Sequence, residues 1–482
     1  MQDSIEQPFV LTIFGASGDL AKLKIFPALF TLAAQKRLPE NCMIVGYARS
    51  DLSEAEFRTE FAESVQAACD KGGMSFPYCQ ATIDGLLEKV FYFSGKYDDL
   101  YDFERYFEFL RETAKRQGMQ PPATHVTYFS VPPSVFQPII HNLAHARSSA
   151  KDDIRIVLEK PFGEDETSAT QLFHFLSRYF REDQVFLLDH YLGKSSVQSI
   201  LALRHNNAVL NLLLNGRDIA SIQITAHESI GVEERAGYFD SAGIIKDMFQ
   251  SHLTQILAMM TMSIPITADA YSFHREKQAI LSALDFSARA ENVYLGQYKG
   301  YKEIKGISPR SETETYFAVK LKIDREAWYG VPIFIRTGKK LKQKTTMVTV
   351  EFRRLPFQKA NVMPNRLIFE LQPEEMIHVK LLNQYGQSSE YHEIATRESI
   401  ACRGEECLPE HARLLLDVFK NEKLNFLSFP EIIAEWRITD KILNFIRDKQ
   451  LPVHPYEPGI LAPEGIEQVF RNKEEYWYEL ES

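Results

Sequence analysis

The stretch PFVLTIFGASGDLAK, residues 8–22, decides the fold of the N-terminal part of the chain. Its first seven residues are almost continuously apolar, which indicates a buried strand, and a helical pattern follows through Leu32. Gly15 and Gly18 lie between the two, where a strand turns sharply into a helix. Such a turn aims the N–H groups of the helix N-terminus at an anion. A plain strand-to-helix turn is the alternative interpretation, because the spacing Gly-x-x-Gly-x-x-Ala by itself is a weak signal.

Further apolar runs alternate with polar, helix-period segments over the rest of residues 1–190. These runs read CMIVGYARS, KVFYFSG, THVTYFSVP, IRIVLEKPF and QVFLLD. Strands that alternate with helices are typical of a parallel sheet covered on both faces. We therefore expect an α/β protein whose N-terminal domain, residues 1–190, is a Rossmann-like doubly wound domain that binds a dinucleotide.

The pattern changes after residue 190. Helical stretches at about 194–214 and 241–262 are followed by closely spaced strands without helices between them. These strands read YFAVKLKI, VPIFIRTG, TMVTVEF, RLIFEL and MIHVKLL. Such spacing predicts a mainly antiparallel sheet, so residues 191–482 are expected to form a larger α+β domain for substrate binding. An exposed face of this sheet would serve oligomerisation.

Charge and composition exclude several classes of protein. The chain has 482 residues, with 55 Lys and Arg against 65 Asp and Glu, so its formal charge of −10 argues against nucleic-acid binding. Five Cys without a C-x-x-C pair argue against zinc and against a disulfide framework, and they favour a reducing cytosol. The acidic start lacks the pattern of a signal peptide, and no apolar run is long enough to span a membrane. We expect a soluble, cytoplasmic protein without a bound metal.

The second apolar run ends in GYARS, with Arg49 at the tip. NAD-binding folds usually have an acidic residue here, which holds the ribose hydroxyls but would repel a 2′-phosphate. A guanidinium can hold such a phosphate through two parallel hydrogen bonds. Arg49 therefore favours NADP as the coenzyme, although a solvated loop arginine is the alternative and some use of NAD stays open.

The string LDHYLGK, residues 188–194, lies at the end of the last strand of the first domain, where ligands of doubly wound folds bind. If a helix begins here, His190, Tyr191 and Lys194 share one side, and their donors suit a phosphate. Asp189 points elsewhere and could orient another group. A polar helix start is the alternative interpretation of this string.

Two later segments carry further candidates. Glu228, Asp247 and His252 lie between residues 228 and 252, and a histidine suits the removal of a proton from a carbinol near neutral pH. A lone histidine on an apolar helix is, however, more often a core residue. The segment IRTGKKLKQKTT adds Lys339 and Lys344, which are either a solvated charge run or part of an anion site.

Six strings together carry a resemblance to one family. GASGDLAK, GYARS, EKPFG, DHYLGK, GYFD…GIIKDMFQSH and RTGKKL run in order from residue 15 to residue 344. In this order and approximate spacing they resemble glucose-6-phosphate dehydrogenases, for which DHYLGK is the signature. The resemblance implies oxidation of glucose 6-phosphate at C1 to the lactone, with hydride transfer to NADP, which is the first step of the oxidative pentose phosphate pathway. It also implies a homodimer or homotetramer.

The same resemblance assigns residues to roles. It implies that His252 takes the proton from the C1 hydroxyl and that Asp189 hydrogen-bonds this histidine. Residues implied to hold the substrate phosphate are His190, Tyr191, Lys194 and Lys344. Residues implied to surround the sugar hydroxyls are Lys160, Glu228, Asp247 and Lys339. Residues implied at the coenzyme are Gly15, Ser17, Gly18, Arg49, Tyr97 and again Lys160.

Some positions depart from the family pattern. His227 replaces the lysine that is usual beside Glu228, and Leu187-Leu188 replaces Arg-Ile before DHYLGK. Where mammalian members place basic residues for a second, structural NADP, this chain has Thr345, Thr349 and Glu370, so we expect that second site to be absent.

The sequence leaves two alternative functions open. One is a sugar dehydrogenase of the glucose–fructose oxidoreductase type, which also has a Glu-Lys-Pro string but lacks a phosphate cluster. The other is a non-catalytic NADP(H) sensor.

Overall fold

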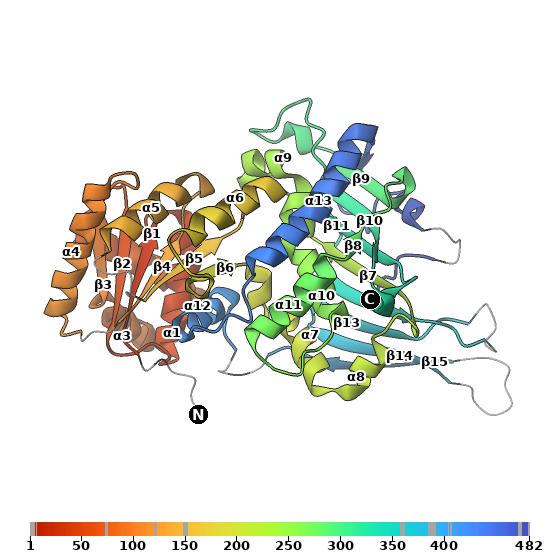
Figure 1. Ribbon diagram of the computed structural model, residues 1–482, viewed down its shortest axis with the longest axis horizontal. Helices are drawn as coiled ribbons and strands as arrows, with labels where there is room; N and C mark the ends of the chain where they lie inside the picture. Colours follow the sequence, from red (N-terminus) through yellow and green to blue (C-terminus); the bar gives the residue numbers. More distant parts are fainter. Residues whose placement is uncertain are drawn as a thin grey trace. The chain divides into compact units, whose positions relative to one another are not determined.

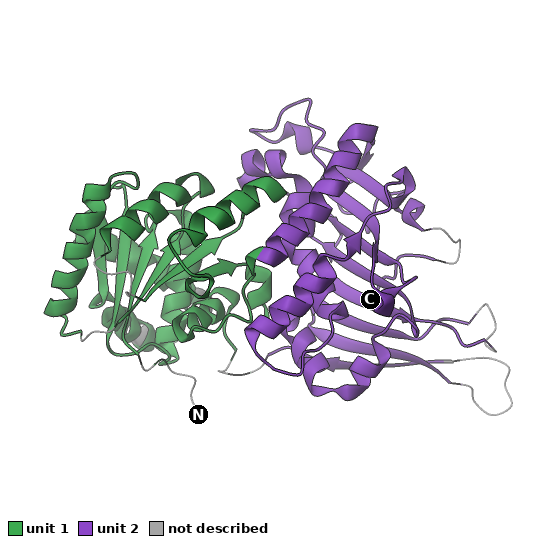
Figure 2. Ribbon diagram, viewed as in Figure 1, with its two compact units in different colours: residues 1–194, 403–429 green, residues 195–402, 430–482 purple. Residues whose placement is uncertain are grey.

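The computed structural model describes residues 5, 7–72, 76–119, 123–147, 153–356, 362–383, 392–402, 404, 407–470 and 475–480. The chain divides into two compact units, unit 1 with residues 1–194 and 403–429, and unit 2 with residues 195–402 and 430–482 (Figure 2). The predicted division at residue 190 therefore needs one correction, because a later segment returns to the first unit. Within that segment, helix α12 (Glu410–Lys420) packs against the first helix, α1 (Phe26–Ala34).

Unit 1 contains the predicted parallel sheet. Its strands are β1 (Phe9–Phe14), β2 (Cys42–Ala48), β3 (Val90–Ser94), β4 (Thr124–Phe129), β5 (Ile154–Glu159) and β6 (Val185–Leu188). They lie in the order β3-β2-β1-β4-β5-β6, and all neighbours are parallel. This is the strand order of the doubly wound dinucleotide-binding fold, in which the direction of winding reverses beside β1. The Rossmann-like prediction is confirmed.

Both faces of this sheet are covered (Figure 1). The helices of unit 1 besides α1 and α12 are α2 (Glu54–Gly72), α3 (Phe76–Leu87), α4 (Leu100–Arg116), α5 (Phe136–Ala146) and α6 (Glu166–Ser177). Leu11 and Ile13, two residues apart on β1, share a buried core with residues of α1, α2, α3 and α12. Phe14 faces the other way and stacks on Phe103 of α4, with ring centroids 5.9 Å apart. Continuous apolar strands suit this burial on both faces.

One expectation about the cysteines is wrong. Cys69 on α2 and Cys79 on α3 form a disulfide, with Cα atoms 6.3 Å apart. Both side chains are buried, because α2 and α3 pack on each other and turn these positions inward. A separation of ten residues is not a recognisable sequence signal, which is why the pair was missed. Cys42 on β2 is a buried thiol, and burial raises its pKa to about 11.

Unit 2 is built on a second, larger sheet. Its strands are β7 (Ile219–His227), β8 (Leu284–Asp285), β9 (Val293–Tyr298), β10 (Tyr316–Ile323), β11 (Ile333–Gly338), β12 (Thr345–Phe352), β13 (Arg366–Gln372), β14 (Met376–Asn383), β15 (His392–Ser399) and β16 (Val453–Tyr456). The order is β15-β14-β13-β12-β7-β11-β10-β9-β16, with β8 beside β10. Most neighbours are antiparallel, as predicted, but β7 and β11 are parallel, as are β9 and β16.

The helices of unit 2 include three that lie side by side on one face of this sheet, α10, α11 and α13 (Figure 1). The α-helices in the described part of unit 2 are α7 (Ser195–Asn206), α8 (Ala208–Leu213), α9 (Ala236–Ile244), α10 (Thr254–Thr261), α11 (Ala270–Leu281) and α13 (Phe429–Lys449). The predicted continuous helix over 241–262 is interrupted, since a π-helical segment, Ile245–Leu253, separates α9 from α10. Among the described residues, no helix has the length and apolar character needed to cross a membrane.

Residues 475–480 cover part of the sheet face that we expected to be exposed. Tyr478 packs on Met347 and Ile368, and the carboxylate of Glu479 lies 2.6 Å from the guanidinium of the fully buried Arg336. The use of this face in oligomerisation stays a prediction.

Candidate active site

The turn after β1 brings the backbone of three strands together. Gly15 has φ +81°, a conformation that residues with a side chain rarely adopt, and its N–H donates to the carbonyl of Tyr47 at 2.8 Å. A Cβ on Gly15 would lie 2.2 Å from the carbonyl oxygen of Ser130. Gly18 then donates to the carbonyl of Gly15 at 3.0 Å and closes the turn. Only glycine fits at position 15, and the turn leaves the following helix start open to an anion.

The other predicted coenzyme residues surround this turn. The hydroxyls of Ser17 and Ser50 lie 3.1 Å apart, which joins the turn to the end of β2. The guanidinium of the exposed Arg49 lies 5.5 Å from the ring centroid of Tyr97, within the range of a cation–π contact. Burial raises the pKa of Tyr97, although Arg49 and the backbone of Gly15 act against this shift. Unit 1 therefore brings Gly15, Ser17, Arg49 and Tyr97 together.

Lys160 follows directly after β5 and precedes a cis bond to Pro161. The residue before it, Glu159, accepts a hydrogen bond from the hydroxyl of Tyr128. Burial raises the pKa of the Glu159 carboxyl to about 6, in spite of the hydrogen bond from Tyr128 and the charge of Lys24. His411 of α12 lies 3.9 Å from the same carboxylate, so the segment that returns to unit 1 supports the end of β5.

The predicted anion cluster begins at the end of β6. Asp189 is fully buried and accepts a hydrogen bond from the N–H of Tyr191 at 2.9 Å, which starts a short 3-10 turn over His190–Gly193. The expected α-helix begins only at Ser195, because Lys194 has an extended backbone. The ammonium of Lys194 nevertheless lies 3.5 Å from the ring centroid of Tyr191, and the rings of His190 and Tyr191 are 5.2 Å apart. The three predicted donors are therefore neighbours.

Unit 2 gathers a second charged cluster at one end of its sheet. Glu228 follows β7 and Lys339 follows β11, and these parallel strands pair His227 with Gly338. The two side chains therefore emerge together, and the ammonium of Lys339 binds the carboxylate of Glu228 and lies 3.1 Å from that of Asp247. Burial alone would lower the pKa of Lys339, but Asp247 and Glu228 outweigh it and raise this pKa. Two carboxylates held by one buried cation are suited to bind sugar hydroxyls.

His252 is buried and comes directly after a strained residue. Ser251 has φ +82° and ψ −74°, the values of the rare γ-turn that residues other than glycine adopt at a cost of about 1–3 kcal/mol. The regular helix predicted between Asp247 and His252 is therefore wrong, because Gln250 and Ser251 leave the helical conformation. Backbone strain of this kind gathers at functional sites, where the surroundings impose it.

A second interruption precedes Asp247, at Gly243, which has φ +70°. Glu314, next to the start of β10, holds it in place. Its carbonyl accepts from the N–H of Ile244 at 3.0 Å, and its carboxyl accepts from that of Ile245 at 3.2 Å. Glu314 was not predicted from the sequence, where the glycine inside a helical pattern was the only signal of this interruption.

Most of the predicted site residues lie in one of the groups described above, but Lys344 does not. Lys344 is exposed just before β12, and in the described part of the chain it makes no hydrogen bond or ion pair. Asp189 lies in unit 1 and His252 in unit 2, so their pairing stays a prediction. Thr345, Thr349 and Glu370 are buried, and Glu370 accepts a hydrogen bond from His378 at 2.8 Å.

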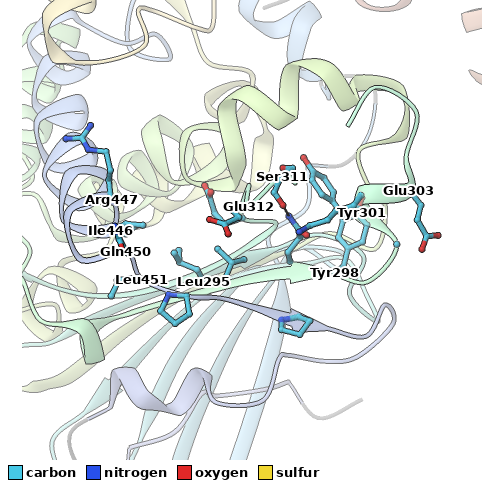
Figure 3. A pocket seen from close by; sticks show the side chains of 17 residues that line it. Leu295, Tyr298, Tyr301, Glu303, Ser311, Glu312, Ile446, Arg447, Gln450 and Leu451 are labelled. Carbon is cyan, nitrogen blue, oxygen red and sulfur yellow. Dashed lines mark hydrogen bonds between the residues drawn. The ribbon is translucent and has the colours of Figure 1, made fainter. Parts of the chain in front are cut away.

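A pocket of about 930 Å³ lies elsewhere in unit 2 (Figure 3). Its walls include Tyr301, Ser311, Glu314 and Arg447, and none of the predicted site residues is among the described residues that line it. Tyr301 and Ser311 both donate hydrogen bonds to the carboxylate of Asp240, at 3.0 and 2.5 Å. The pocket therefore adjoins the anchors of α9 rather than the predicted site.

Comparisons with known proteins cover nearly the whole chain. Residues 12–199 match the family described as glucose-6-phosphate dehydrogenase, NAD binding domain, and residues 201–478 match its C-terminal domain. A chloroplastic glucose-6-phosphate 1-dehydrogenase of Solanum tuberosum is 34% identical, over 98% of this chain and 83% of the relative. The glucose-6-phosphate 1-dehydrogenase of Aggregatibacter actinomycetemcomitans is 33% identical, over 97% of this chain and 96% of the relative.

A solved structure gives the same result. A glucose-6-phosphate dehydrogenase in complex with its substrate glucose 6-phosphate is 30% identical, with a TM-score of 0.89, over 99% of this chain and 100% of that one. Both domains, the strand order of unit 1 and the sheet of unit 2 therefore agree with one family. This chain belongs to the glucose-6-phosphate dehydrogenase family.

Proposed function

We propose that this chain oxidises glucose 6-phosphate at C1 to 6-phosphogluconolactone, with NADP as the hydride acceptor. A bound NADP would supply the hydride acceptor, C4 of its nicotinamide ring. Side chains of the two charged clusters and of the turn after β1, together with Lys160, His252 and Lys344, do the rest. The proposal rests on family membership together with the arrangement of these groups within each unit.

The turn after β1 suits the dinucleotide. Gly15 permits the tight turn beside Ser130, where a Cβ would collide with the carbonyl of that residue, and the turn directs the N–H groups of the helix start toward a pyrophosphate. Ser17, Gly18, Tyr97 and Lys160 complete this part of the site. Arg49 holds the 2′-phosphate, since its guanidinium is exposed, lies 5.5 Å from the ring centroid of Tyr97, and can grip a phosphate through two N–H groups.

The substrate contacts come from both clusters. Lys194, His190 and Tyr191 hold the phosphate, because together they offer an ammonium, an imidazole and a phenol within one turn. Lys344 adds a second cation. Lys339, Glu228 and Asp247 bind the sugar hydroxyls, since their ion pairs fix each group in one orientation.

His252 acts as the general base. It takes the proton from the C1 hydroxyl as the hydride leaves C1, so that electrons and proton depart from the same carbinol. Asp189 hydrogen-bonds the imidazole, fixes its tautomer and stabilises the imidazolium that forms. The strained backbone at Ser251 supports this role, because it directs the side chain that follows.

The observation that carries the choice of substrate is the contact of Lys194 with Tyr191 in the turn that begins at Asp189. It favours a phosphorylated sugar over the free sugar of glucose–fructose oxidoreductases. Initial rates at 340 nm with glucose 6-phosphate and with glucose, each under NADP and NAD, test this. A strong preference for free glucose would refute the proposal, and binding of NADPH without turnover would favour a sensor.

His252→Asn tests the base. It should lower kcat by roughly 10²–10⁴-fold with little change in KM. An unchanged kcat would remove His252 from the mechanism and leave the substrate assignment standing.

We further propose a homodimer or homotetramer in the cytoplasm, with one NADP site in each chain. The large sheet of unit 2 supports oligomerisation, since the described side chains of β14 and β15 are exposed or half-buried, with Leu381 and Ile394 among the exposed ones. Sedimentation equilibrium at several concentrations tests the assembly, and a monomer throughout would refute it.

A further inference from the structure

One buried carboxylate, that of Glu435, contacts a glutamine on each side of His252 in the chain. Glu435, on α13, is fully buried and accepts a hydrogen bond from the side-chain amide of Gln255 at 2.6 Å. The amide of Gln250 lies 3.5 Å from the other oxygen of the same carboxylate, at the outer limit for a hydrogen bond. Gln250 precedes His252 by two residues and Gln255 follows it by three. The strained residue Ser251 therefore lies between two anchors that end on one side chain.

These contacts belong to a buried polar network. The ammonium of Lys277 on α11 donates to the amide oxygen of Gln255 at 3.1 Å and pairs with Glu431 at 3.0 Å. His274 lies 3.3 Å from the same oxygen of Glu431. Lys277, Glu431 and Glu435 are all almost fully buried, so each is held by the others in one geometry. Within this network, Glu435 directly contacts Gln250 and Gln255 on either side of His252, whereas Glu431 pairs with Lys277 and His274 of α11.

The backbone explains why such anchors are needed. The φ of Ser251 would relax toward the helical region if nothing opposed it, because a residue with a side chain is strained there. Relaxation would turn the Cα–Cβ bond of His252 to a new direction. Thr254 adds a local restraint, since its hydroxyl donates to the carbonyl of Ser251 at 3.0 Å. That bond stays within the segment, so it does not fix the segment relative to the sheet and α13.

We propose that Glu435 is a positioning residue for His252. It holds Gln250 and Gln255 and thereby keeps the strained turn at Ser251 in the form that presents the imidazole to the substrate. This inference rests on the proposed role of His252 as the base. Glu435 acts through the backbone and touches neither substrate nor coenzyme.

Glu435→Leu removes the acceptor and keeps much of the volume. We expect kcat to fall about 10- to 100-fold, because small displacements of a catalytic group cost this much, while KM for both substrates stays within about threefold. Glu435→Gln should restore most of kcat. Its amide oxygen can accept from Gln255, and its NH₂ can donate to Gln250 once that amide turns over.

Glu431→Leu is the matched control, since it removes an equally buried carboxylate one turn earlier on α13. Glu431→Leu leaves Lys277 without its ion pair, so this variant should lose at least as much Tm as Glu435→Leu. Its kcat should nevertheless stay near that of the unaltered enzyme. An equal fall of kcat in both leucine variants would overturn the proposal, because general loosening of the helices would then explain it. An unchanged kcat in Glu435→Leu would overturn it directly.

If Glu435→Leu fails to fold, Gln250→Met decides. It removes one anchor while Glu435 keeps Gln255, and kcat should again fall about tenfold without a change in KM. A full kcat would refute the positioning role. His252→Asn in the same assay separates a failure of the base assignment from a failure of the positioning role of Glu435. If that variant is active, the base assignment has failed, whereas an inactive His252→Asn beside a fully active Gln250→Met refutes only the role of Glu435.

Discussion

Glu314→Gln should stabilise the protein at alkaline pH and leave it nearly unchanged at acidic pH. The carboxyl of Glu314 lies against the interruption at Gly243, where a Cβ would come within 2.2 Å of its oxygen, and it accepts the N–H of Ile245. Burial raises the pKa of this carboxyl to about 7, although its backbone hydrogen bonds and Lys246 act in the opposite direction. The amide of glutamine can accept the same N–H and never ionises.

The sign and size follow from the two pKa values. Because the pKa is about 7 in the folded chain and about 4.5 in the unfolded chain, the stabilising contribution is fully present below pH 4.5 and is lost as the pH rises through 7. A difference of about 2.5 pKa units corresponds to roughly 3 kcal/mol in the free energy of unfolding. Between pH 5 and pH 8.5 about 2–3 kcal/mol of this should develop.

Thermal unfolding at pH 5 and pH 8.5 measures the effect. The Tm of Glu314→Gln minus that of the unaltered protein should increase by roughly 2–5 °C between the two pH values. Glu312→Gln, at an exposed neighbour in the wall of the same pocket, should leave the two pH curves parallel. Parallel curves for Glu314→Gln itself would show that this carboxyl is not held protonated beneath the interruption, and the reasoning would fail.

Three further substitutions test the ligand sites. Lys194→Ala should raise KM for glucose 6-phosphate about 10- to 100-fold, since it removes a charge-assisted hydrogen bond of about 1.5–3 kcal/mol, and a loss confined to NADP affinity in initial-rate kinetics would contradict this. Arg49→Asp should shift kcat/KM from NADP toward NAD, and an unaffected ratio would mean that Arg49 is merely solvated. Gly15→Val should abolish coenzyme binding in fluorescence titrations, because its side chain would collide with Ser130, and normal affinity would show that the turn can rearrange.

Local patterns in the sequence were sufficient for much of the fold. The continuous apolar runs of β1 to β6 predicted strands buried on both faces, because a sheet covered by helices leaves no polar side. Gly15 predicted the turn at its own position, because glycine readily adopts the positive φ that this turn requires. Arg49 and the donors at 190–194 lie within a few residues of a strand end, so their grouping needed no long-range information. The nature of the turn after Asp189 was missed, as one 3-10 turn and a helix start share the same spacing.

Only the tertiary structure decided features that join distant parts of the chain. The ion cluster of Lys339 depends on the parallel register of β7 and β11, which pairs residues more than a hundred positions apart. The disulfide between Cys69 and Cys79 depends on how α2 packs on α3. The return of α12 to unit 1 depends on the packing of its apolar face against α1. The strained Ser251 looks like helix in any local window, because its conformation is imposed by surroundings that include the buried side chains of α13. Periodicity reports which residues are buried, whereas strain and ion pairing depend on which partners are buried with them.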